Sequence, residues 1–320
     1  MNYYYAPLEG ITDDIFRRLH HKYFPGVDRY YTPFLSPTYS GPALTKRDQR
    51  EVAPENNQGI VLVPQILTNN AENFLKGAEA LHTLGYEEVN LNLGCPSGTV
   101  SAKGKGAGFL SRKEELERFL DEIFEKCPMK ISIKTRLGKE SPEEFHALME
   151  LYNRYPIPEL TVHPRVQKDF YKHPVRWEGW DYAAKNSRAP LCLSGGIGIK
   201  GDLERHFADK ELPPALMLGR GLVANPALVM QLKGTGTLEK KTLEAFHGEL
   251  FEETASRLGS PRNTMFRMKE IWGFMMLSFD NREKHQKALR KATTLTEYQG
   301  AVARIFRDLE IRQDAEISWV

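Results

Sequence analysis

Eight short β-rich runs, most of them separated by helical patterns, constrain the fold of this chain more than any other feature. They cover residues 3–6, 29–32, 60–65, 88–91, 131–134, 159–163, 191–194 and 215–218. Strands that alternate with helices predict an α/β fold with a parallel sheet, and eight such units predict a closed (β/α)8 TIM barrel. An open doubly wound sheet is the alternative. It would place a Gly-x-Gly-x-x-Gly pattern after the first strand, where this sequence has Ala-Pro-Leu-Glu-Gly.

The helices predicted between these strands carry signals for their starts. A helix is predicted at residues 70–84. It starts at Asn70, a good N-terminal cap, and its apolar residues recur along one stripe. Ser111 and Glu114 have the spacing of a capping box and predict a helix over residues 111–124. Another helix is predicted to start at residues 141–144, Ser-Pro-Glu-Glu, with proline in its first turn.

The strand signals stop near Thr237. Four further helices are predicted at residues 242–258, 263–279, 281–289 and 295–309. The stretch before them, residues 233–237, is polar and glycine-rich, as is typical of a linker. We therefore predict a barrel domain at residues 1–234 and an appended C-terminal helical bundle at residues 237–320.

Composition excludes several classes of protein. The chain is 41% hydrophobic and 27% charged, which is ordinary for a protein with a large core, and it contains no apolar run of about 18 residues that could span a bilayer. Its first residues lack a signal-peptide pattern, so we expect a cytoplasmic protein without membrane contact. Three cysteines without CxxC spacing argue against a disulfide framework and against a metal site.

Charge is nearly balanced overall, at +2, but it is unevenly distributed. Residues 257–291 contain nine Lys or Arg against three acids, whereas residues 239–253 contain five acids against two lysines. The basic block has two interpretations. It is either an ordinary solvated helical face or a surface that binds RNA phosphates.

A single thiol stands at a predicted strand end. In residues 89–96, apolar residues alternate with Asn90 and Asn92 as in a strand, Gly94 breaks it, and Cys95 and Pro96 follow. Barrel enzymes keep their chemistry at such strand ends. With an unperturbed pKa of about 8.5 the thiol would be a proton donor at neutral pH. A thiolate nucleophile and a buried structural cysteine are the alternatives.

Two glycine turns predict an anion site. Ser194, Gly195 and Gly196 follow the seventh strand, and Gly219 and Arg220 follow the eighth, where barrels commonly bind phosphate. Small residues expose backbone N–H groups to an anion, and an arginine adds a charged partner. A sugar phosphate and a flavin mononucleotide would satisfy these turns equally well, and two ordinary turns are the bland alternative.

Further polar side chains at the predicted strand ends suit a flavin. Lys134 ends the fifth strand, where a cation can stabilise a reduced flavin, although a salt bridge is the alternative role. Gln65 offers a donor and an acceptor to the ring edge, and His163 offers a donor if it is not merely structural. The first-strand loop Pro7-Leu8-Glu9 offers peptide groups.

The run VNLNLGCPSGTVSAKGKGA resembles the signature of the tRNA-dihydrouridine synthases. The motifs APLE, IKTRLG, HPR, SGG and GR, together with Gln65, also resemble motifs of that family. Three positions depart from the pattern: Lys105 and Pro164 replace usual glycines, and Ser194 replaces a usual asparagine.

The resemblance implies that NADPH reduces bound FMN, which then passes a hydride to C6 of a uracil in tRNA while Cys95 protonates C5. A uracil inside folded RNA must be flipped out of its stack to reach such a site, and we expect the basic segment of the C-terminal helices to bind the surrounding RNA. We also expect a monomer. The resemblance also implies a set of substrate-binding residues: Asn92, Arg136, Arg165, Lys168 and Tyr171. Three alternatives stay open: a dihydroorotate dehydrogenase-like FMN barrel acting on a free pyrimidine, a non-flavin isomerase barrel that binds phosphate, and a non-catalytic RNA-binding protein.

Overall fold

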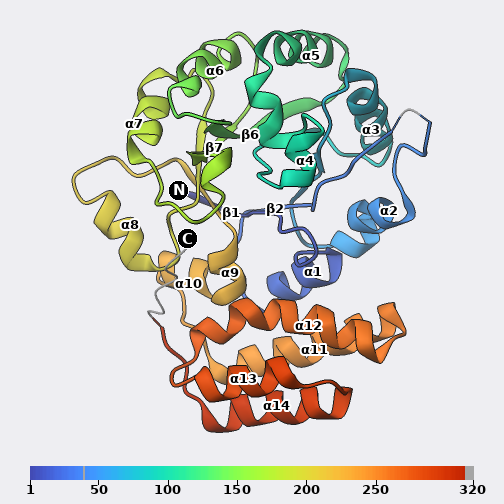
Figure 1. Cartoon of the computed structure of the whole chain (residues 1–320), viewed down its shortest axis with the longest axis vertical. Coiled ribbons are helices and arrows are strands. Elements are labelled where there is room, and N and C mark those ends of the chain that lie inside the picture. Colours follow the sequence, from blue (N-terminus) through green and yellow to red (C-terminus); the bar gives the residue numbers. More distant parts are fainter. Residues whose placement is uncertain (39, 314–320) are drawn as a thin grey trace.

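The computed structural model describes residues 1–38 and 40–313 and shows a ring of parallel strands surrounded by helices (Figure 1). The strands are β1 (Asn2–Tyr5), β2 (Arg29–Tyr31), β3 (Leu62–Val63), β4 (Gln65–Ile66), β5 (Glu88–Leu93), β6 (Lys130–Gly138), β7 (Leu160–Val166), β8 (Leu191–Ser194) and β9 (Ala215–Leu218). Their order is β3-β2-β1-β9-β8-β7-β6-β5-β4, and every neighbouring pair is parallel. The predicted barrel is therefore confirmed.

The barrel closes through a proline. Pro64 alone separates β3 from β4, so the two segments occupy one strand position and the nine segments form the eight predicted ones. Val63 accepts a hydrogen bond from the Thr32 amide on the β2 side at 3.3 Å. The Pro64 carbonyl accepts one from the Asn90 amide on the β5 side at 2.8 Å. Proline has no N–H to donate, which explains the interruption.

The interior of the barrel is filled and is not a pore. A small apolar cluster occupies it, formed by Tyr4, Ala6, Tyr31, Val63, Cys192, Ala215 and Met217. At the amino-terminal end of the strands the hydroxyl groups of Tyr4 and Tyr31 donate to the Glu159 carboxylate, at 2.8 and 3.4 Å. These contacts fill that end of the interior with side chains.

The helices cover the outside of the ring. The α-helices of the barrel are α1 (Asp14–Tyr23), α2 (Lys46–Val52), α3 (Ala71–Thr83), α4 (Gly98–Ala102), α5 (Lys113–Lys126), α6 (Glu144–Tyr152), α7 (Trp177–Asn186), α8 (Lys200–His206), α9 (Arg220–Ala224) and α10 (Leu228–Lys233). Short 3-10 helices lie at η1 (Pro54–Asn57), η2 (Gly106–Ser111) and η3 (Gln167–Asp169).

The predicted helix starts were right at one position and wrong at two. Asn70 caps α3 by accepting from the Asn73 amide, as expected. Ser111 instead ends η2 and donates to the Gly108 carbonyl, so α5 starts without a side-chain cap. Residues 141–143 precede α6, and the Glu144 carboxylate accepts backbone N–H groups from residues 139–141, because the chain turns there before the helix begins.

Four C-terminal helices stack against one side of the barrel beside α1, in orange and red in Figure 1. They are α11 (Lys240–Leu258), α12 (Pro261–Met275, continued by η4, Met276–Ser278), α13 (Glu283–Lys291) and α14 (Leu295–Asp308). Phe246 of α11 packs edge-on against Phe16 and Phe24, with ring centroids 5.6 and 5.4 Å apart. One hydrophobic cluster thus runs through both parts, while the predicted division near residues 234–237 stays a prediction.

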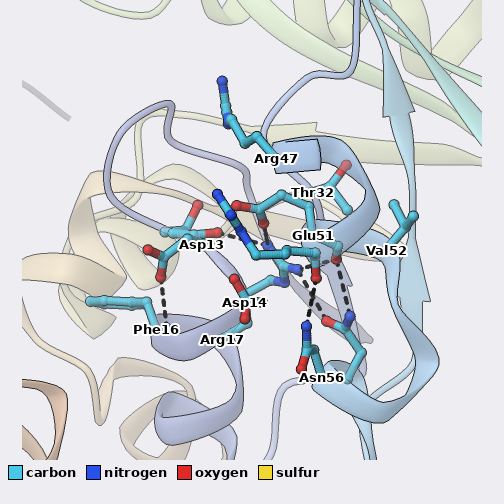
Figure 2. Close-up of polar contacts among 12 residues, drawn as sticks. Asp13, Asp14, Phe16, Arg17, Thr32, Arg47, Glu51, Val52 and Asn56 are labelled. Atoms are coloured by element: carbon cyan, nitrogen blue, oxygen red, sulfur yellow. Dashed lines mark hydrogen bonds and ion pairs between the residues drawn. The ribbon is translucent and has the colours of Figure 1, made fainter. Parts of the chain in front are cut away.

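A buried ionic network joins the first helices at this side (Figure 2). The Arg17 guanidinium donates to the Glu51 carboxylate at 2.8 Å, and only 1% of the arginine side chain is exposed. It also donates to the backbone carbonyls of Thr12 and Glu51. Asp13, drawn beside this group, caps α1 by accepting from the Phe16 amide at 3.0 Å. The network fixes the loop between β1 and α1.

Candidate active site

A cavity of about 560 Å³ opens at the carboxyl end of the strands. The residues predicted to form a site that also line this cavity are Pro7, Leu8, Glu9, Gln65, Asn92, Cys95, Lys134, Arg136, His163, Tyr171, Ser194, Gly195, Gly219 and Arg220. They come from all around the ring, and only the closure of the barrel brings them together. The volume suits an organic cofactor or a nucleotide.

The Cys95 loop is held by three different elements. The carbonyl of Gly94 accepts from the Arg136 guanidinium of β6 at 2.9 Å. The carbonyl of Cys95 accepts from the amide of Ala107 in η2 at 3.1 Å. The carbonyl of Pro96 accepts from the Gln167 side chain of η3 at 2.9 Å. Three consecutive peptide groups are thereby fixed, which restricts where the thiol can point.

A chain of buried side-chain amides supports the same loop from below. Asn92 accepts the amides of Gly94 and Cys95 on one oxygen, at 3.0 and 2.9 Å. The Asn92 amide donates to Gln65, which donates to Asn90, at 2.6 and 2.8 Å. The chain ends at the Ser132 hydroxyl. The side-chain NH2 groups of Gln65 and Asn92 each donate one hydrogen bond within this chain, so each keeps one further N–H for a ligand.

Glycine is required beside the thiol. Gly106 has a left-handed backbone (φ +56°), and a Cβ there would lie 2.9 Å from the Cβ and 2.9 Å from the carbonyl oxygen of Cys95. Lys105, by contrast, has an extended backbone (φ −107°), which any residue can adopt. The departure of Lys105 from the family pattern therefore strains nothing locally.

Burial keeps the thiol protonated. It raises the pKa of Cys95, and the lowering effects of the Ser97 amide and the Arg136 charge do not overcome it. Burial, with repulsion from Arg136, lowers the pKa of Lys134 to about 8. At neutral pH the cavity thus holds a neutral thiol and a lysine that is still mostly charged. A neutral thiol can donate a proton, whereas a thiolate could not.

One side of the cavity is strongly cationic. The Arg165 guanidinium donates to His163 Nε2 at 2.8 Å, and since arginine cannot accept, His163 is neutral with its proton on Nδ1. Burial and the surrounding cations lower the pKa of His163 well below its usual range. The Arg220 guanidinium stacks 3.8 Å from the Tyr171 ring centroid. Burial lowers the pKa of Arg220 to about 10.

This cationic side calls for an anion. Lys134, Arg136 and Arg220 line the cavity together, and among its described lining residues Glu9 is the only carboxylate. Glu9 is itself paired with Arg47 at 2.6 Å. Buried like charges repel one another. The Asp169 carboxylate offsets part of this repulsion at Arg136, and an anionic ligand in the cavity would offset more of it.

Gly195 and Gly219 of the predicted glycine turns line the cavity beside its cations. Gly195 has a left-handed backbone (φ +88°), and a Cβ there would come within 2.7 Å of His163 Nε2. A Cβ at Gly219 would lie 3.4 Å from Ala6. A side chain at Gly195 would therefore collide with the cationic wall, and its absence keeps the space in front of His163 clear for a ligand.

Three of the predicted site residues do not line the cavity. Arg165 is buried behind His163 and donates to the His173 carbonyl at 2.8 Å. Lys168 forms an ion pair with Glu140 and is 62% exposed. Gly196 (φ +80°) is packed against Val175 and Trp177. Arg165 and Gly196 thus support the wall, whereas Lys168 lies on the surface.

Several lining residues escaped the sequence prediction. They are the apolar residues Ala6, Ile11, Pro33, Phe34, Ile197, Met217, Leu218 and Phe274, together with the loop residues Gly94 and Pro96. Phe274 belongs to α12, nearly 180 residues after Cys95 in the chain. An apolar residue in a helix normally indicates core packing, so no local signal separates Phe274 from its buried neighbours.

The basic segment 257–291 divides into two groups. Arg257 binds the Asp14 carboxylate with two hydrogen bonds of 2.6 Å, and Arg267 binds Asp13 at 3.0 Å. The Lys269 ammonium caps the end of α13 through the carbonyls of residues 290 and 292. These three cations hold the tail in place. Others in the segment are exposed: Arg262, Lys284, Lys287, Arg290 and Lys291.

In residues 1–38 and 40–313, none of the helices combines the length and the apolar character needed to cross a membrane. Within the same ranges, no group of three or more His, Cys, Asp or Glu side chains is arranged to hold a metal ion.

Comparisons with known proteins agree with the geometry. A probable tRNA-dihydrouridine synthase from Staphylococcus epidermidis is 27% identical over 256 residues, which cover 78% of this chain and 77% of the relative. A tRNA-dihydrouridine(16) synthase from Pseudomonas putida is 27% identical over 290 residues, with 86% and 88% covered. The solved structure of a variant of NCR from Zymomonas mobilis has a TM-score of 0.51 at 12% identity, covering 77% of this chain and 90% of that one, and shows the shared barrel fold alone.

The family model described as Dihydrouridine synthase (Dus) matches residues 4–307. The match includes both the barrel and almost all of the C-terminal helices. Because it spans nearly the whole chain, this protein belongs to the dihydrouridine synthase family.

Proposed function

We propose that this enzyme binds FMN in the barrel cavity and uses NADPH to reduce the C5–C6 double bond of a uridine in tRNA. One observation carries the proposal: a buried, protonated thiol and three cations, Lys134, Arg136 and Arg220, line the same cavity. The names of the relatives, tRNA-dihydrouridine synthases, support tRNA as the substrate.

The cavity fits FMN in three respects. The turns at Gly195 and Gly219, with Arg220 beside them, would hold the phosphate. Lys134 and Gln65 would contact the polar edge of the ring, where a partly charged lysine stabilises negative charge. The first-strand loop at residues 7–9 adds apolar surface and peptide groups. A reduced flavin bound there supplies a hydride to C6 of the uracil.

Cys95 then has one task, which is to deliver a proton to uracil C5. Its raised pKa keeps the proton on sulfur until the base arrives. The three hydrogen bonds to the carbonyls of residues 94–96 hold the backbone that carries the thiol, which matters because proton transfer needs close and fixed geometry. The remaining N–H of Asn92, next to the thiol loop, is available to a uracil carbonyl.

A uridine within folded RNA reaches this cavity only if it is extruded from its stack. The exposed cations of the C-terminal helices, Arg262, Lys284, Lys287, Arg290 and Lys291, would bind the surrounding phosphates. We further infer that the enzyme works as a monomer in the cytoplasm, where tRNA is modified.

The test uses purified protein, unmodified tRNA transcript, FMN and NADPH, with dihydrouridine measured by mass spectrometry. The wild type should form dihydrouridine. The Cys95→Ala variant should form none, yet should stay yellow and reducible by NADPH. Cys127→Ala is the matched control, since this half-buried thiol ends α5 and does not line the cavity, and it should stay active.

Three results would contradict the proposal. A colourless wild-type protein that takes up no FMN would favour an isomerase barrel. Turnover of free orotate without activity on tRNA would favour the dihydroorotate dehydrogenase-like alternative. Loss of flavin from Cys95→Ala would show that the thiol is structural.

A further inference from the structure

The cavity wall includes one residue from outside the barrel. Phe274 lies near the end of α12 and is half-buried, and it lines the cavity together with Ile11 and Phe34. The cations that line the cavity come from β6 and the start of α9. An anionic cofactor needs those cations, whereas an aromatic ring on an outer helix offers only apolar surface to a flat group.

Helix α12 is hydrogen-bonded to the loop at residues 6–13, which lines part of the cavity. The Arg267 guanidinium donates from Nη2 to the Ile11 carbonyl and to the Asp13 carboxylate, both at 3.0 Å. Only 16% of the Arg267 side chain is exposed. Its guanidinium also passes over Gly10, where a Cβ would lie 3.6 Å from Nη1. The loop at residues 6–13 contributes five lining residues, so Arg267 connects α12 to a large part of the cavity wall.

The same helix carries exposed groups that suit RNA. Arg262 lies 5.5 Å from the Phe266 ring centroid, and 48% of Phe266 is exposed. Phe266 and Phe274 are eight residues apart, about 12 Å along a helix and roughly on one face. Glu270, also exposed, lies between them and would repel a phosphate at that point. Helix α12 therefore extends from a basic surface to the cavity mouth.

From these contacts we propose that Phe274 is a specificity-determining residue that contacts the base or ribose of the uridine as it enters the cavity, and that Arg267 is a positioning residue that sets the place of α12. The inference rests on the proposed function. Aromatic side chains stack on nucleobases regardless of their sequence, and a base has a flat face to offer. The C-terminal helices would then shape the cavity as well as bind the RNA backbone.

Phe274→Ala tests the first part, and Leu258→Ala at the end of α11 is its control, because Leu258 is 41% exposed and does not line the cavity. We expect kcat with saturating tRNA to fall about tenfold for Phe274→Ala and less than twofold for Leu258→Ala. The flavin content and the rate of flavin reduction by NADPH without RNA should equal those of the wild type. Equal losses in both variants, an unchanged kcat, or a loss of flavin from Phe274→Ala would each overturn the assignment.

Arg267→Met tests the second part. It should reproduce the fall in kcat, and Arg267→Lys should restore at least half of the activity, because one ammonium can donate to both acceptors. Arg257→Met is the matched control: it breaks the ion pair to Asp14 but leaves the Ile11 carbonyl bonded. It should lower the melting temperature about as much as Arg267→Met and leave kcat within twofold.

A fall in kcat for Arg257→Met that matches its loss of stability would show that Arg267 acts only through stability, and would refute its positioning role. The proposed function fails separately from this inference. A wild-type enzyme that does not reduce tRNA refutes the function, whereas an active wild type with normal Phe274→Ala and Arg267→Met variants refutes only the inference.

Discussion

A methyl group added at Gly106 should impair catalysis as well as stability. The left-handed backbone at this position (φ +56°) costs an L-residue about 1–2 kcal/mol. The added Cβ would also lie 2.9 Å from Cys95, against about 3.4 Å for an ordinary contact, so the thiol loop must move by about 0.5 Å (3.4 − 2.9). Reactive groups must be held within about 0.5 Å of their productive positions, so a shift of this size reaches the limit. A misplacement of 1 Å can lower the rate about a hundredfold. We therefore expect uridine reduction by Gly106→Ala to fall at least tenfold.

The control is a glycine with the same backbone and empty surroundings. Gly259 has φ +57°, and a Cβ there would meet nothing within 4 Å. Gly259→Ala should lose about 1–2 kcal/mol of unfolding free energy in urea titrations, and Gly106→Ala at least as much, because its Cβ also meets Cys95. Only Gly106→Ala should lose turnover on tRNA transcript, with flavin reduction by NADPH preserved. The reasoning is refuted if the two variants keep equal activity, or if Gly106→Ala loses its flavin.

Three more predictions concern charge and positioning. Arg17→Met should lower the unfolding free energy, measured in urea, by about 3 kcal/mol, because it leaves the buried Glu51 carboxylate unpaired. The double variant Arg17→Met, Glu51→Met should recover at least half of that loss. A double variant as unstable as the single one would contradict this reasoning. Lys134→Met should raise the unfolding free energy of the flavin-free protein by up to about 3 kcal/mol at pH 7, which corresponds to the drop in pKa from 10.5 to about 8. Since the folded pKa of about 8 lies below the unfolded value of 10.5, this gain should be complete below pH 8 and vanish by about pH 10.5, and a gain that does not depend on pH would count against it. Gln167→Leu removes the donor to the Pro96 carbonyl and should lower kcat about tenfold with unchanged flavin content, and a normal kcat would show that the other two carbonyl contacts suffice.

The barrel could be predicted because its signals are local. Each strand is a short apolar or alternating run, and the eight runs recur at the right spacing. The split at Pro64 and the start of α5 were missed for a different reason. The split depends on hydrogen bonds with other strands, such as that from the Asn90 amide to the Pro64 carbonyl. The start of α5 depends on the Ser111 hydroxyl, which donates to the Gly108 carbonyl and does not cap the helix. A capping-box spacing alone does not decide which turn the chain takes.

The site could be predicted where a side chain points from the end of a strand. Cys95, Lys134 and His163 line the cavity because parallel strands all end at the same rim. Phe274 and Gln167 could not be found in this way. One comes from a helix packed beside the barrel, and the other acts through a backbone carbonyl, so only tertiary structure reveals them.

The interruption at Pro64 leaves a weak point in the ring. Pro64 donates no hydrogen bond, and the next amide, that of Gln65, donates to the Thr32 hydroxyl instead of to a strand carbonyl. Thermal fluctuations should open the wall here first, and amide hydrogens along this edge should exchange with deuterium sooner than those between β6 and β7. Gln65 also accepts a hydrogen bond from Asn92, which in turn accepts one from the Cys95 amide. Opening of this edge would therefore also move the Cys95 loop, and a bound ligand that contacts Gln65 would reduce the motion of both.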